Sequence, residues 1–114
     1  MTEHELSFSG NLLYISGRSI VLEYPIADAF IGERGVIVLL NPDSFQEKTG
    51  QFLNLLCISR EGERVWVAEL PTNESGDRYY RIASKCPLVA YSVKSFECMI
   101  DPWSGKLVGK EFYK

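Results

Sequence analysis

NLLYIS, at residues 11–16, returns almost unchanged as NLLCIS at residues 54–59, and this repeat is the main indication of the fold. A tight turn with a glycine and then a second apolar run follow each copy, so each copy opens a strand–turn–strand unit. A further step of similar length reaches residues 97–101, which Gly105 and another apolar run follow. Units of this kind that repeat every ~40–45 residues are typical of propeller blades, although unrelated hairpins can also resemble one another by chance.

The rest of the chain has the same β character. Short runs rich in Val, Ile, Leu, Tyr and Phe are separated by Gly, Asn, Asp, Ser and Pro. Strands are expected near residues 6–8, 12–15, 19–24, 28–31, 36–40, 53–59, 64–70, 79–83, 88–92, 95–100 and 107–112. Because tight turns join several of these runs, consecutive strands should pair as antiparallel hairpins. The sequence therefore predicts an all-β antiparallel meander of about ten strands, curled into an open or closed barrel or a sandwich.

The length sets the number of units. The 114 residues leave room for one domain, 1–114. Within it, blade-like units are expected near 11–53 and 54–96, with a partial unit at 97–114. A propeller ring needs at least about four blades, so this chain cannot close a ring by itself.

The second half of the chain carries a family pattern in three stretches, residues 54–66, 99–107 and 110–114. It consists of a short strand, an acidic–Gly turn, an aliphatic–Trp pair and a closing Asp-Pro-x-x-Gly-Lys segment. The pattern resembles small bacterial all-β proteins with propeller-blade-like hairpin repeats, and the blades resemble those of quinone-dependent dehydrogenases. The quinone pocket of those enzymes needs a complete ring, so the resemblance implies no cofactor here. A looser resemblance links the chain to immunity proteins of contact-dependent growth inhibition systems.

Residue counts argue against an enzyme. The one histidine is His4, near the start of the chain, so a Ser-His-Asp triad, a Cys-His pair or a multi-histidine metal site is not expected. The cysteines Cys57, Cys86 and Cys98 lack the spacing of a zinc site and are expected to be reduced thiols of a cytoplasmic protein. We therefore expect no catalytic residue, no metal and no cofactor.

Charge narrows the choice of partner. The net charge of −3 argues against nucleic acid, and the sequence shows neither a targeting segment nor an apolar run long enough for a membrane. Residues 1–77 hold 12 acidic and 5 basic side chains, whereas residues 78–114 hold 3 and 7. The acidic part either attracts a basic protein partner or consists of solvated turns.

Seven residues are the candidate partner contacts. The acidic members would meet a basic surface, and the two aromatic members would anchor it. They are Asp28, Glu33, Glu69, Glu74, Asp77, Tyr80 and Trp103.

These observations predict a non-enzymatic protein-binding module. Its most specific form is an immunity protein that neutralises a bacterial toxin, for example a nuclease, by blocking the active site. A nuclease is basic because it binds phosphates, so an acidic inhibitor would compete with nucleic acid for the same positively charged surface. Two alternatives stay open: a β-barrel that binds a small apolar ligand, and a self-assembling β module of several copies.

Overall fold

The computed structural model describes residues 6–46 and 49–113, and within them eleven strands form three antiparallel sheets. The first sheet holds β1 (Leu6–Ser9), β2 (Leu12–Ile15) and β3 (Arg18–Val21). The second holds β4 (Ile26–Ile31), β5 (Val36–Leu40), β6 (Leu55–Ile58) and β7 (Arg64–Val67). The third holds β8 (Tyr79–Lys85), β9 (Leu88–Ser92), β10 (Phe96–Ile100) and β11 (Leu107–Phe112). A 3-10 turn, Pro42–Ser44, follows β5.

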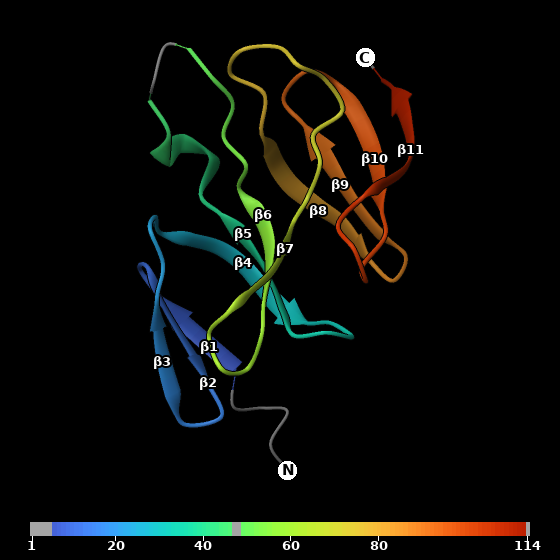
Figure 1. Cartoon of the computed structure of the whole chain (residues 1–114). Helices are drawn as coiled ribbons and strands as arrows, with labels where there is room; N and C mark the ends of the chain where they lie inside the picture. Colours follow the sequence, from blue (N-terminus) through green and yellow to red (C-terminus); the bar gives the residue numbers. More distant parts are fainter. Residues whose placement is uncertain (1–5, 47–48, 114) are drawn as a thin grey trace.

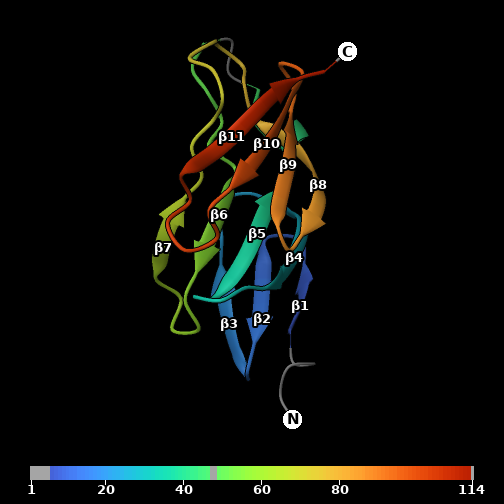
Figure 2. The same cartoon turned by 90° about the vertical axis from the view of Figure 1, so that its right-hand side faces the viewer.

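Within each sheet, every strand pairs with its neighbours in sequence, which confirms the predicted all-β antiparallel meander. None of the three sheets closes on itself within the described residues, so the closed form among the predicted options is wrong. The sheets instead lie face to face as a layered sandwich, with the first sheet at one side, the second in the middle and the third at the other side (Figure 1). Figure 2 shows β8–β11 in front of the second sheet.

The second sheet is the middle layer because both of its faces are apolar. All five residues of β5 and all four of β6 are buried. In β5, Val36, Val38 and Leu40 pack into a core shared with the first sheet, whereas Ile37 and Leu39 pack into a core shared with the third. Successive side chains of a strand point to opposite faces, so an unbroken apolar run is the pattern of a strand covered on both sides.

The sequence repeat has a structural meaning. Its copies form β2 and β6, and the run 97–101 forms most of β10, each of them the strand before the last in its sheet. The hairpins that follow lead to the outermost strands β3, β7 and β11. The sheets span 6–21, 26–67 and 79–112, so they do not coincide with the units expected at 11–53, 54–96 and 97–114. The difference arises because the recognisable stretch lies inside each sheet rather than at its first strand.

Candidate functional site

The seven candidate contact residues do not form one surface. Glu33 lies in the turn between β4 and β5, and Trp103 lies in the turn between β10 and β11. Glu74 and Asp77 lie in the connection between β7 and β8, which Figure 1 shows at the top of the molecule, away from those two turns. Glu69 lies earlier in the same connection, whereas Asp28 is on β4 and Tyr80 is on β8.

Asp77 is a correction to the prediction, because its side chain is completely buried. Its Oδ1 accepts hydrogen bonds from the Ser92 hydroxyl (2.6 Å) and the Arg78 backbone N–H (2.9 Å). Its Oδ2 accepts one from the Thr72 hydroxyl at 2.7 Å. A carboxylate whose oxygens are all engaged inside the fold cannot contact a partner, so Asp77 is a structural residue of its loop.

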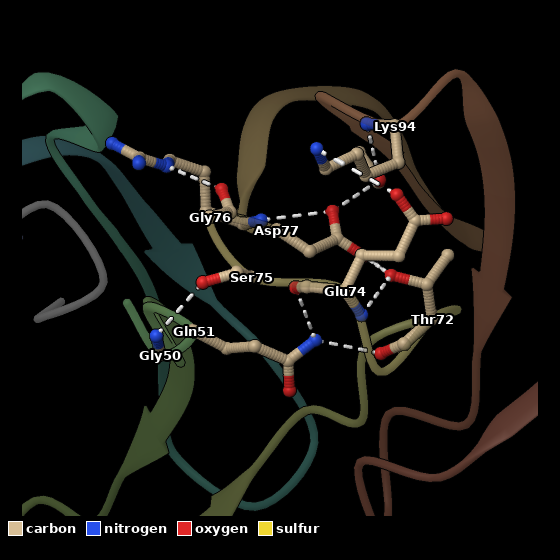
Figure 3. A network of polar contacts seen from close by, with 10 residues as sticks. Gly50, Gln51, Thr72, Glu74, Ser75, Gly76, Asp77 and Lys94 are labelled. Atoms are coloured by element: carbon tan, nitrogen blue, oxygen red, sulfur yellow. Dashed lines mark hydrogen bonds and ion pairs between the residues drawn. The ribbon is translucent and has the colours of Figure 1, made fainter. Parts of the chain in front are cut away.

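Figure 3 shows how the same loop is held from the neighbouring segment. The Gln51 amide nitrogen donates to the backbone carbonyls of Thr72 (2.7 Å) and Glu74 (3.1 Å), and the Gly50 N–H donates to the Ser75 hydroxyl. The exposed Glu74 carboxylate lies 3.7 Å from the Lys94 ammonium group. Glu74 therefore reaches the surface, but as half of an ion pair.

Asp28 and Glu69 hold backbone groups in place. Oδ1 of the half-buried Asp28 accepts a hydrogen bond from the Ala29 N–H at 2.9 Å. The Glu69 side chain accepts one from the Leu107 N–H at 2.9 Å, and its backbone carbonyl accepts one from the Tyr79 hydroxyl. Glu69 thus joins the segment after β7 to the edge of the third sheet.

Trp103 and Glu33 are the two candidates that the structure brings to the same end. Trp103 is 56% exposed, and the Arg34 guanidinium lies 4.8 Å from its ring centre. The same guanidinium donates to the Trp103 backbone carbonyl at 2.7 Å, which ties the β4–β5 turn to the β10–β11 turn. Arg34 was missed by sequence reasoning because its partner is 69 residues away, and no local pattern signals such a pair.

The turn that carries Trp103 is fixed from several sides. Asp101 accepts hydrogen bonds from the Trp103 N–H and the Ser104 hydroxyl, both at 2.9 Å. The buried Trp66 ring donates to the Pro102 carbonyl at 2.9 Å. Gly105 has φ +79°, and a Cβ there would lie 2.7 Å from the Trp66 ring, so only glycine fits.

A cleft opens beside this turn, between the second and third sheets. Its volume is about 400 Å³. It is lined by Phe30, Ile31, Gly32, Glu33, Ile37, Lys85, Cys86 and Pro102. The Lys85 ammonium lies 5.3 Å from the Phe30 ring centre, so the mostly apolar cleft carries one cation and one carboxylate.

The cysteines follow the prediction in part. Cys57 and Cys98 are buried, and Cys86 is exposed at the cleft. Burial raises the pKa of the Cys57 thiol, and it raises the pKa of Cys98 to about 11. Both buried thiols are therefore protonated at neutral pH, the state that packs as a small apolar group.

Tyr80 lies apart from the cleft, near the start of β8. It is 40% exposed, and its hydroxyl lies 2.6 Å from the Tyr113 hydroxyl. The Tyr91 ring lies 6.2 Å from Tyr80 and 5.1 Å from Tyr113. Tyr80 therefore belongs to an aromatic cluster on the third sheet rather than to the end with Trp103.

These features define an all-β protein of three stacked meander sheets, with an apolar cleft between two of them and an exposed tryptophan beside it. The chain belongs to the family described as Domain of unknown function (DUF7957), whose family model matches residues 3–112. Neither the comparison with curated proteins nor that with solved structures gives a match. In the described part of the chain, no helix is long and apolar enough to cross a membrane.

Proposed function

We propose that this protein is a non-enzymatic, cytoplasmic protein-binding module that binds its partner at the cleft between the second and third sheets. The observation that carries the proposal is Trp103. More than half of its surface is exposed although it sits in a turn held by Asp101 and Arg34. A fixed, exposed tryptophan loses little conformational freedom on binding, and tryptophan is among the residues that contribute most to protein interfaces.

The more specific proposal is an immunity protein that blocks the active site of a basic bacterial toxin. Glu33 is the acidic candidate at the cleft, where it would meet a cation of the partner. Asp28, Glu69 and Glu74 are not among the residues that line the cleft, so they act through the long-range field rather than by contact. A field of this kind raises the association rate and weakens as salt is added.

The test is calorimetric titration of the chain with the toxin domain encoded by a neighbouring gene. Trp103→Ala should weaken binding by at least about tenfold, and Glu33→Gln should reduce the salt dependence of the affinity. Tyr14→Ala is the matched control, because Tyr14 is an exposed aromatic residue on the first sheet. The proposal fails if Trp103→Ala and Tyr14→Ala bind alike.

The cleft itself favours a second candidate, the binding of a small apolar ligand. Its volume of about 400 Å³ lies within the range of ~300–1,000 Å³ that is typical of ligand sites. Phe30, Ile31 and Ile37 supply apolar walls. An environment-sensitive apolar dye should then bind the native protein and become more fluorescent. Ile31→Glu should abolish this increase in dye fluorescence, whereas Tyr14→Ala should leave it unchanged. A native protein that takes up no dye would eliminate this candidate.

A further inference from the structure

The outer face of the third sheet is an uncovered surface away from the cleft. Its inner face, which includes Cys98, Ala90 and Ile100, packs into the core shared with the second sheet. On the outer face, Met99 is 44% exposed, and its neighbour Val89, which belongs to neither of the two cores, is only 9% exposed. A groove of about 380 Å³ runs over β9, β10 and β11 here. The groove is lined by Val89, Glu97, Met99, Val108, Gly109, Lys110 and Glu111.

The strand register arranges this face into two rows. Residues that pair directly across neighbouring strands share a face. One row runs Arg81, Tyr91, Glu97 and Glu111, from β8 to β11. The next row runs Ser84, Val89, Met99 and Gly109 in the same direction.

The first row changes sign across the sheet. Its cation, Arg81, lies on β8, where the guanidinium is 5.6 Å from the Tyr91 ring centre. Its carboxylates, Glu97 and Glu111, lie on β10 and β11. The row is therefore basic at one edge of the sheet and acidic at the other.

Such a row is complementary to its own copy. A two-fold axis parallel to the strands, between two copies of this face, places β8 of one copy over β11 of the other. Arg81 then faces Glu111 of the second copy twice over, Tyr91 faces Glu97, and Val89 faces Met99. The small pair Ser84 and Gly109 meets at the same time, which allows the two sheets to approach at the usual ~10 Å.

The outer face of the first sheet offers no such match. Its rows are Ser7, Tyr14 and Ser19, and Ser9, Leu12 and Val21, and they contain no charged side chain. Stacking this face on the third sheet of another copy would leave Arg81 and Glu111 without partners at a covered surface, which is costly. Charge therefore favours the third sheet against itself.

We propose that the outer face of the third sheet is a homodimer interface, in which Arg81 of each copy pairs with Glu111 of the other. It repeats between two chains the sheet-on-sheet packing that the protein uses twice within one chain. The interface lies on a different surface from the cleft, so its test is separate from that of the proposed function.

The experiment is sedimentation equilibrium of the complete chain over about 1–100 µM. We expect a mass that approaches twice that of the chain. Arg81→Glu and Glu111→Arg should each raise the dissociation constant by about tenfold or more, because each places like charges face to face in both symmetric contacts. The double variant Arg81→Glu/Glu111→Arg should restore the dimer, which a merely structural effect of either substitution would not do.

Arg64→Glu is the matched control, since Arg64 is an exposed arginine on β7 of the second sheet and lies outside this face. It should leave the dissociation constant unchanged. Three results would each overturn the proposal: a wild-type chain that is monomeric throughout, a dimer that survives both single reversals, or an assembly that grows with concentration beyond two copies. The last would indicate head-to-tail stacking of the first sheet on the third.

Discussion

Replacing Asn54 by alanine should destabilise the protein far more than any surface change. The Asn54 side chain is completely buried between the second and third sheets. Its Nδ2 donates to the carbonyls of Leu40 (3.0 Å) and Tyr79 (2.7 Å), and its Oδ1 accepts from the Tyr79 N–H at 3.0 Å. Alanine leaves three buried backbone groups without these partners.

The size of the effect follows from that count. A buried polar group without a partner costs ~1–3 kcal/mol, and water that enters the vacated space recovers part of the loss. We therefore expect Asn54→Ala to lower the free energy of unfolding by about 3–5 kcal/mol. That is a large share of the ~5–15 kcal/mol that keeps a domain folded. The measurement is urea unfolding followed by tryptophan fluorescence and by circular dichroism, with both probes required to give one transition.

The repeat supplies a matched control. Asn11 stands at the position of Asn54 in the first copy, but its amide is only half-buried and makes one side-chain hydrogen bond, to the Leu22 carbonyl at 2.9 Å. Asn11→Ala should cost about 0.5–1.5 kcal/mol. If the two variants differed by less than ~1 kcal/mol, the argument that Asn54 bridges two sheets through its amide would be refuted.

Two further predictions concern buried side chains. Gly105→Ala should lower the free energy of unfolding, measured in urea, by at least ~1 kcal/mol more than Gly17→Ala does. Both glycines have φ near +80°, but only the new Cβ at position 105 would collide with the Trp66 ring, so equal losses would contradict this packing. The free energy of unfolding should also fall as the pH rises from about 9 towards 11. Burial raises the pKa of the Cys98 thiol from its ordinary 9.0 to about 11, so the thiol loses its proton at a lower pH in the unfolded chain than in the folded one. Cys98→Ala should make that fall shallower, and an unchanged slope would show that the thiol does not contribute.

The strand pattern could be read from the sequence because it depends on local features. The runs 12–15, 36–40, 88–92 and 107–112 were predicted with the bounds that the structure has. Hairpin turns with glycine joined them correctly into a meander. Strand ends were less certain: the run 53–59 shortens to Leu55–Ile58, since Asn54 turns its amide to the neighbouring sheet instead of continuing the strand.

The candidate site could be predicted only in part, because the position of a polar side chain depends on distant partners. Asp77 looked like a loop carboxylate, and its burial depends on Ser92, which a strand 15 residues further on brings to it. Trp103 was recognised because a tryptophan in a turn has little to pack against within its own hairpin. The cleft beside it is lined from β4, β5, β8 and the turns next to them, and no local sequence pattern predicts the order in which the sheets stack.

The outer faces of the first and third sheets, at the two ends of the stack, differ in composition, and this difference supports the proposed dimer. Any stack of sheets leaves one uncovered face at each end, and a polar face is what allows such an end to remain in water. The outer face of the first sheet combines Ser7, Ser9 and Ser19 with Leu12, Tyr14 and Val21, and none of these side chains is charged. The third sheet instead combines Met99 with tyrosines and opposite charges at its two edges, the composition of a surface that is covered by a partner. Arg81 and Glu111 lie in one row on the two edge strands of the sheet, and only this separation lets each of them meet its opposite charge when the face packs against its own copy.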